Sequence, residues 1–181
     1  YRAESDICEI ARLLREGFDY ELLHCFAMNT TTAALAELGS AELNIVLTNE
    51  AVPCAEYLQS VTGTPFVYLP PYGYSQTTDF LKSVAAVINK PVKEAVLQRL
   101  EEKNRRLKML LNSPLMSRTP GTVFLKGDYD TVKGLGAFFK ELRFNVAHSV
   151  CAHKISGTAA EDIEYFKEEK EYLQLLKDIH H

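Results

Sequence analysis

The 181-residue sequence contains no apolar run that approaches the roughly 18 to 20 residues of a membrane-spanning helix. It also lacks low-complexity tracts, solenoid-type internal repeats and a recognisable signal peptide. Its 24 acidic and 20 basic residues give a formal net charge of −4, so a basic nucleic-acid-binding surface is not expected. Because 46% of the residues are hydrophobic, the chain can bury a core and is not intrinsically disordered.

Cysteine is also scarce, and no pair forms a CxxC motif. The four cysteines are Cys8, Cys25, Cys54 and Cys151. A disulfide framework in a small secreted protein would be denser and more regular, so the pattern favours a reducing, cytoplasmic location. The sequence begins with Tyr1 and not Met, which we interpret as a piece of a longer protein.

Familiar cofactor and catalytic motifs are missing as well. The sequence has no Walker motif, no GxGxxG, and no defensible Ser-His-Asp, Cys-His or paired-acid arrangement, so the catalytic residues are unknown. Gly127 and Asp128 follow an expected strand and precede an expected helix, a place where cofactors bind. They are candidate cofactor-binding residues, although packing and helix capping are the favoured explanation.

Two cysteines raise the question of metal binding or reactivity. Cys151 and His153 share one face of an expected strand, but two ligands do not make a metal centre, and no metal site is predicted. Cys54 lies near the start of an expected helix, where a thiolate would be stabilised. We favour a packing role for Cys54.

What the sequence does contain is a regular alternation of apolar strands and amphipathic helices. The expected strands are residues 20–28, 43–47, 65–69, 122–125 and 144–151. The expected helices are residues 5–17, 32–39, 53–62, 75–88, 91–111, 131–142 and 158–179. The last of these starts with a capping box, Thr158 to Glu161. In the helix over 75–88, four residues share an inward face: Phe80, Leu81, Val84 and Val87.

This alternation predicts an α/β fold of parallel-sheet, Rossmann-like βαβ units, with three strands plus two joined by a long helix. Residues 1–90 would form the first unit, 91–121 a long charged helix and connection, and 122–181 an incomplete opening of the next unit. The charges of the long helix lie three and four residues apart, which is typical of a solvated face. An incomplete sheet exposes an edge, so we expect self-association through residues 122 to 179.

The best-placed residues for a ligand pocket follow the second and third expected strands. Ligands of open parallel sheets bind beyond the carboxyl ends of the strands. The candidate cofactor- or substrate-binding residues at these two positions are Thr48, Asn49, Glu50, Pro71, Gly73 and Thr77. Spacing gives the place of a pocket and does not identify its ligand.

Several segments in order resemble one family. They are LNIVL (43–47), GTPF (63–66), PPYGYSQTTDFL (70–81), the charged helix 97–111, and TVFLKGDYDTVKGLGAFFKELRFNV (122–146). Together they resemble the nitrogenase component 1 family, whose members include the molybdenum-iron protein subunits, their cofactor-assembly relatives and dark-operative protochlorophyllide reductase-like proteins. The resemblance covers nearly the whole chain.

The resemblance implies three Rossmann-like units in the parent protein, of which this chain would hold the latter part of the middle unit and the start of the third. It implies an oxidoreductase subunit that receives electrons from an ATP-dependent iron–sulfur reductase component and pairs with a homologous component 1 subunit. No cofactor is expected within this chain, and the isolated chain is expected to be inactive. The parent would carry an iron–sulfur cluster, with a further metal cluster or a tetrapyrrole substrate as alternatives.

Two departures from the family pattern narrow this expectation. The molybdenum-iron catalytic subunit has a metal-ligating Cys near the end of the strand that matches 43–47, where this chain reads Leu47-Thr48-Asn49. The chain therefore better resembles a partner subunit or a nitrogenase-like reductase. Arg143 stands where the family commonly has Gly after the helix. A cofactor-assembly scaffold of the same family and a non-redox module that binds a small ligand remain the alternatives.

Overall fold

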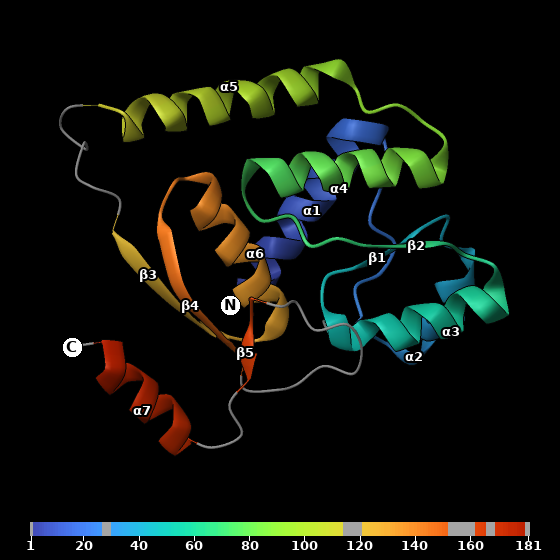
Figure 1. Cartoon of the computed structure of the whole chain (residues 1–181). Coiled ribbons are helices and arrows are strands. Elements are labelled where there is room, and N and C mark those ends of the chain that lie inside the picture. The colour runs from blue at the N-terminus through green and yellow to red at the C-terminus, as the bar shows by residue number, and fades with distance from the viewer. Residues whose placement is uncertain (1, 27–29, 114–120, 152–161, 166–168, 180–181) are drawn as a thin grey trace. The chain divides into compact units, whose positions relative to one another are not determined.

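The computed structural model describes residues 2–26, 30–113, 121–151, 162–165 and 169–179 (Figure 1). The chain divides between Leu107 and Lys108 into two compact units. This division lies inside the 91–121 segment that the sequence marks as a connection. None of the described helices is long and apolar enough to cross a membrane.

Unit 1 alternates helices with two short parallel strands. Its elements are α1 (Arg2–Phe18), α2 (Thr32–Ala36), the 3-10 helix η1 (Leu38–Ser40), β1 (Asn44–Val46), the 3-10 helix η2 (Asn49–Ala51), α3 (Val52–Thr62), β2 (Phe66–Tyr68), α4 (Gly73–Ile88) and α5 (Glu94–Leu111), the last of which runs past Leu107. β1 pairs with β2 in parallel, with Asn44 opposite Phe66 and Val46 opposite Tyr68. The two strands therefore end at the same edge of the sheet.

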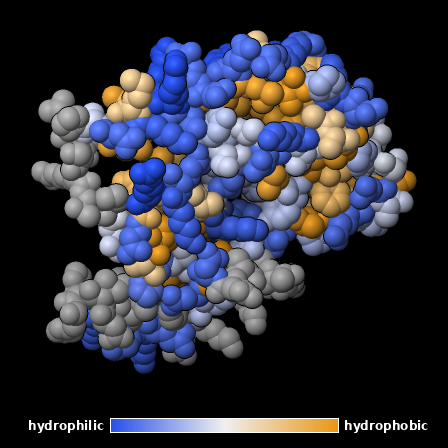
Figure 2. Space-filling model, turned by 45° about the horizontal axis from the view of Figure 1, so that its top comes forward, coloured by the Kyte–Doolittle hydropathy of each residue, from blue (hydrophilic) through white to orange (hydrophobic). Residues whose placement is uncertain are grey.

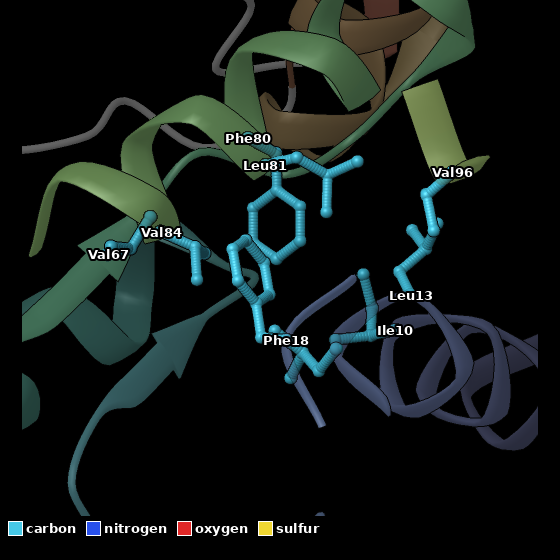
Figure 3. Close-up of a cluster of buried hydrophobic side chains, with 9 residues drawn as sticks. Ile10, Leu13, Phe18, Val67, Phe80, Leu81, Val84 and Val96 are labelled. Atoms are coloured by element: carbon cyan, nitrogen blue, oxygen red, sulfur yellow. The ribbon is translucent and has the colours of Figure 1, made fainter. Parts of the chain in front are cut away.

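The core of unit 1 brings α1, β2, α4 and α5 together (Figure 3). Its buried members are Ile10, Leu13, Leu14, Phe18, Val67, Phe80, Leu81, Val84 and Val96. The α1 members recur three and four residues apart, so they form one apolar face of that helix. Phe80, Leu81 and Val84 are buried as the sequence predicts, whereas Val87, near the end of α4, is 40% exposed and does not face the core.

The carboxyl end of α1 is held by the connection between α4 and α5. The backbone N–H of Lys93 donates to the carbonyl of Gly17 (3.1 Å), and Lys90 Nζ donates to the carbonyl of Phe18. Lys93 Nζ also lies 2.5 Å from Asp19 Oδ1, and this hydrogen bond lowers the pKa of Asp19. Two ammonium groups thus lie at the negative end of the helix dipole, where cations are favoured.

Unit 2 contains a three-stranded parallel sheet in the order β3-β4-β5. Its elements are β3 (Thr122–Gly127), α6 (Tyr129–Glu141), β4 (Asn145–Cys151), β5 (Glu164–Tyr165) and α7 (Glu169–Ile179). α6 packs on the sheet through a core of five buried residues: Leu125, Tyr129, Val132, Cys151 and Ile163. Lys140 of α6 pairs with Asp162 at 2.7 Å, and this bond lowers the pKa of the Asp162 carboxyl group.

Aromatic and charged side chains join β3, β4, β5 and α7. The ring of Phe124 meets the ring of Tyr172 edge-on, with centroids 5.8 Å apart. Lys126 Nζ lies 3.7 Å from the centroid of the Tyr172 ring, a cation–π contact. Across the sheet, His148 Nδ1 lies 2.8 Å from Glu164 Oε1. α7 and β5 are therefore attached to the sheet by side chains as well as by the short β4–β5 ladder.

The parallel α/β class is confirmed, and so are the strands expected at 43–47, 65–69, 122–125 and 144–151. The strand expected at 20–28 is wrong over residues 20–26, which have no strand pairing. Three apolar side chains of this segment stay nearly half exposed: Leu22, Leu23 and Phe26. An apolar run alone therefore does not place this segment in the sheet. Residues 27–29 lie outside the described ones.

The three-plus-two distribution of strands is also wrong for the described residues, which hold two strands in unit 1 and three in unit 2. The third strand of unit 2 is β5, where Val150 pairs with Glu164 and Cys151 with Tyr165. A helix running from 158 to 179 is consequently wrong at these positions, and the described helix starts at Glu169. The capping box at Thr158 to Glu161 lies outside the described residues.

The turn between α6 and β4 contains a strained residue. Arg143 has a φ of 66°, in the left-handed region that glycine adopts freely. The turn is closed by the backbone N–H of Phe144, which donates to the carbonyl of Phe139 at 2.9 Å. The glycine that the family resemblance implies here would suit this conformation better than arginine.

We predict that Arg143→Gly stabilises unit 2 by about 0.5–1 kcal/mol, because it relieves the steric penalty of a Cβ at positive φ. Arg143→Ala is the matched control, since it removes the same side chain and keeps the strain. Urea denaturation of both variants measures the difference. A gain in Arg143→Ala equal to that in Arg143→Gly would show that backbone strain is not the cause.

A second prediction concerns Leu81 in the core of unit 1. Leu81 is fully buried between α1 and the α4–α5 connection, so Leu81→Ala should cost about 2–5 kcal/mol through lost burial and a cavity. Lys82→Ala, at the exposed neighbouring position, should change stability by less than about 0.5 kcal/mol. Urea denaturation tests both, and a Leu81→Ala cost below about 1 kcal/mol would contradict the described packing.

Candidate functional site

The carboxyl edge of the β1–β2 sheet brings two of the expected loops together. Because Val46 lies opposite Tyr68 in a parallel register, the chain leaves both strands at this edge. Thr48 follows β1 by two residues, and Pro71 follows β2 by three. The structure thus places Thr48, Asn49 and Glu50 at the same sheet edge as Pro71, Gly73 and Thr77.

After β1 the chain makes a short 3-10 turn and enters α3. Thr48 is extended (φ −133°, ψ 145°), and its carbonyl accepts the N–H of Ala51 at 3.1 Å. Asn49 is half-buried and Glu50 is exposed. Ala51 precedes α3 and gives no side-chain cap, while Pro53 stands in the first turn, where its missing N–H costs little. The polar side chains at this position are those of Thr48, Asn49 and Glu50, of which Asn49 already takes part in a contact within the protein.

After β2 the chain enters α4 through Pro70, Pro71 and Tyr72. Tyr72 stands at the N-cap position without a side-chain cap, and Gly73 has a φ of 69°, a conformation that favours glycine. Thr77 Oγ1 donates to the carbonyl of Gly73 at 2.5 Å. The hydroxyl proton of Thr77 is therefore used within the helix, so Thr77 can offer a ligand only its oxygen lone pairs.

The helix starts give this edge a definite electrostatic character. The dipoles of α3 and α4 both place their positive ends near the carboxyl edge of the sheet, because α3 begins at Val52 soon after β1 ends and α4 begins at Gly73 soon after β2 ends. Neither N-cap residue, Ala51 or Tyr72, adds a capping carboxylate or hydroxyl. The helix starts therefore favour hydrogen-bond acceptors, whereas the exposed carboxylate of Glu50 at the same edge opposes anionic groups.

The equivalent edge of unit 2 is built differently. Asp128 is the N-cap residue of α6, and its Oδ1 accepts the N–H of Thr131 at 3.3 Å. The carbonyl of Gly127 accepts the thiol of Cys151 at 3.4 Å. Both Gly127 and Asp128 thus take part in holding α6 and β4 together. The capping that the sequence favours is present at Asp128, and a cofactor-binding role for this pair stays a prediction.

The cysteines and histidines do not gather in the described residues. Cys8 and Cys54 are exposed, Cys151 is buried, and partial burial of Cys25 raises the pKa of its thiol. No group of three or more His, Cys, Asp or Glu side chains is positioned to hold a metal among the described residues. His153, the partner that the sequence offers to Cys151, lies outside them.

The exposure of Cys54 contradicts the packing role expected for it. Cys54 lies in the first turn of α3 with its side chain exposed, so the packing role expected from the sequence is wrong.

Three residues at the unit 1 edge are not selected by the sequence reasoning. Tyr68 ends β2, Tyr72 precedes α4, and Gln76 lies in its first turn; each is half-buried or exposed at this edge and takes part in contacts. The signal is present in the sequence, because all three lie within or beside the Pro70–Thr78 run that supplies Pro71, Gly73 and Thr77.

Comparisons with known proteins agree with this architecture. The family model described as nitrogenase component 1 type oxidoreductase matches residues 1–179. The solved structure "Nitrogenase Cp1 at pH 6.5" aligns over 96% of this chain and 44% of its own, with a TM-score of 0.71 and 18% sequence identity. At that identity, the structural likeness establishes the fold alone.

Curated relatives include one of the subunits of light-independent protochlorophyllide reductase, the same one in several bacteria. The protein of Rhodopseudomonas palustris (strain TIE-1) is 37% identical over 105 residues, which are 55% of this chain and 19% of the relative. The protein of Bradyrhizobium sp. (strain ORS 278) is 31% identical over 128 residues, 70% of this chain and 23% of the relative. That of Synechococcus sp. (strain JA-3-3Ab) is 33% identical over 86 residues, 46% of this chain and 16% of the relative.

The chain thus spans about a fifth of the length of these relatives. The family match, in contrast, runs along nearly all of its own length. The fold agrees with that match, because both units are built on parallel strands connected by helices. This chain belongs to the nitrogenase component 1 type oxidoreductase family.

Proposed function

We propose that this chain is part of a cytoplasmic reductase subunit of the protochlorophyllide reductase type. In the full-length protein, the subunit would pair with a homologous component 1 subunit and receive electrons from an ATP-dependent iron–sulfur reductase component. The observation that carries this proposal is the family match over residues 1–179 combined with protochlorophyllide reductase relatives at 31% and 37% identity. A tetrapyrrole of the protochlorophyllide class is the substrate that these relatives support.

The carboxyl edge of the β1–β2 sheet is the proposed wall of the substrate pocket. Thr48, Asn49 and Glu50 would contribute the side that follows β1, and Pro71, Gly73 and Thr77 the side that follows β2. The positive ends of α3 and α4 suit a substrate that carries hydrogen-bond acceptors. This edge would bind and orient the substrate, and we assign no described residue as acid, base or nucleophile.

The described residues do not fit an iron–sulfur cluster. Such clusters are held by a set of cysteine thiolates, typically four. Here Cys8 lies on α1, Cys25 precedes α2, Cys54 lies in the first turn of α3 and Cys151 ends β4, and no ligand group of three forms among the described residues. We therefore assign the cluster to parts of the full-length protein other than these residues. The isolated 181-residue chain should have no reductase activity.

The test uses the full-length protein produced without oxygen together with its partner subunit. We expect it to contain iron and to consume protochlorophyllide, followed by absorbance, when ATP and the iron–sulfur reductase component are both present. Asn49→Ala should weaken protochlorophyllide binding by about two- to tenfold, as expected for one lost hydrogen bond. Ser60→Ala is the matched control, because Ser60 lies exposed near the other end of α3 and its hydroxyl donates to the carbonyl of Tyr57.

Other outcomes would point to the alternatives. An iron-free full-length protein that binds a small ligand without ATP-dependent reduction would support a non-redox binding module. A full-length protein that loads a cluster and then transfers it to another protein would support a cofactor-assembly scaffold. Equal effects of Asn49→Ala and Ser60→Ala would remove Asn49 from the pocket.

Asp128 provides a separate test, because capping and cofactor binding predict different results. Asp128→Ala should destabilise unit 2 by about 0.5–2 kcal/mol through loss of the N-cap. Asp128→Asn keeps an acceptor oxygen at the N-cap position and should be close to the unchanged chain in urea denaturation. If Asp128 also contacts a cofactor, Asp128→Asn of the full-length protein should lower cofactor content while stability is kept. Unchanged content would leave Asp128 as a cap alone.

A further inference from the structure

We draw no further inference here: the strongest candidate, the surface patch of exposed apolar side chains on the segment before α2 (Leu22, Leu23 and Phe26) and on α2 itself (Leu35), is an apolar face, and nothing in the described residues shows what covers it.

Discussion

Parallel pairing of short strands is the constraint on which both units depend. Two parallel strands cannot be joined by a tight turn, so the chain must return through a crossover, here α3 between β1 and β2 and α6 between β3 and β4. Each crossover covers the sheet and starts at its carboxyl edge. The position of the core and the position of the candidate pocket are therefore consequences of the same geometric requirement. The helices do not cover every apolar group, and Figure 2 shows apolar residues at the surface between polar ones.

The carboxyl edges of the two sheets differ in how their helix starts are capped. In unit 2, the carboxylate of Asp128 caps α6 and the carbonyl of Gly127 accepts the thiol of Cys151, so the edge is closed by the protein's own groups. In unit 1, Ala51 and Tyr72 provide no side-chain cap, and Gly73 adopts a positive φ. A ligand that carries acceptor atoms would thus gain more at the unit 1 edge. This difference distinguishes the start of α6, which has a structural cap, from the starts of α3 and α4, which are candidate binding positions.

Periodicity and turn residues predict most elements, because strands such as Leu43–Leu47 and helices such as Ser75–Ile88 have patterns that burial enforces. The failures have physical causes. Residues 20–26 are mostly apolar, yet Tyr20 donates to Glu42 and His24 contacts Glu37, so side-chain bonds to neighbouring segments replace a strand ladder. β5 is only two residues long, which is too short for a periodic signal.

The candidate loops could be placed from the sequence because ligands of open parallel sheets bind beyond the carboxyl ends of the strands. The alternation of strands and helices predicts that parallel topology. Their individual contacts, such as the bond from Thr77 to Gly73, depend on local backbone angles that residue types do not specify.

Three helices end at non-glycine residues with positive φ: Asp19 after α1, Asn89 after α4 and Arg143 after α6. Aspartate and asparagine adopt that conformation more readily than other non-glycine residues, whereas an arginine there is strained. At Asp19, the restraint comes from Lys90 and Lys93, which belong to a segment about seventy residues away. The length of α1 is therefore a property of the assembled unit, and this helix end should melt together with the core in one cooperative transition instead of fraying first.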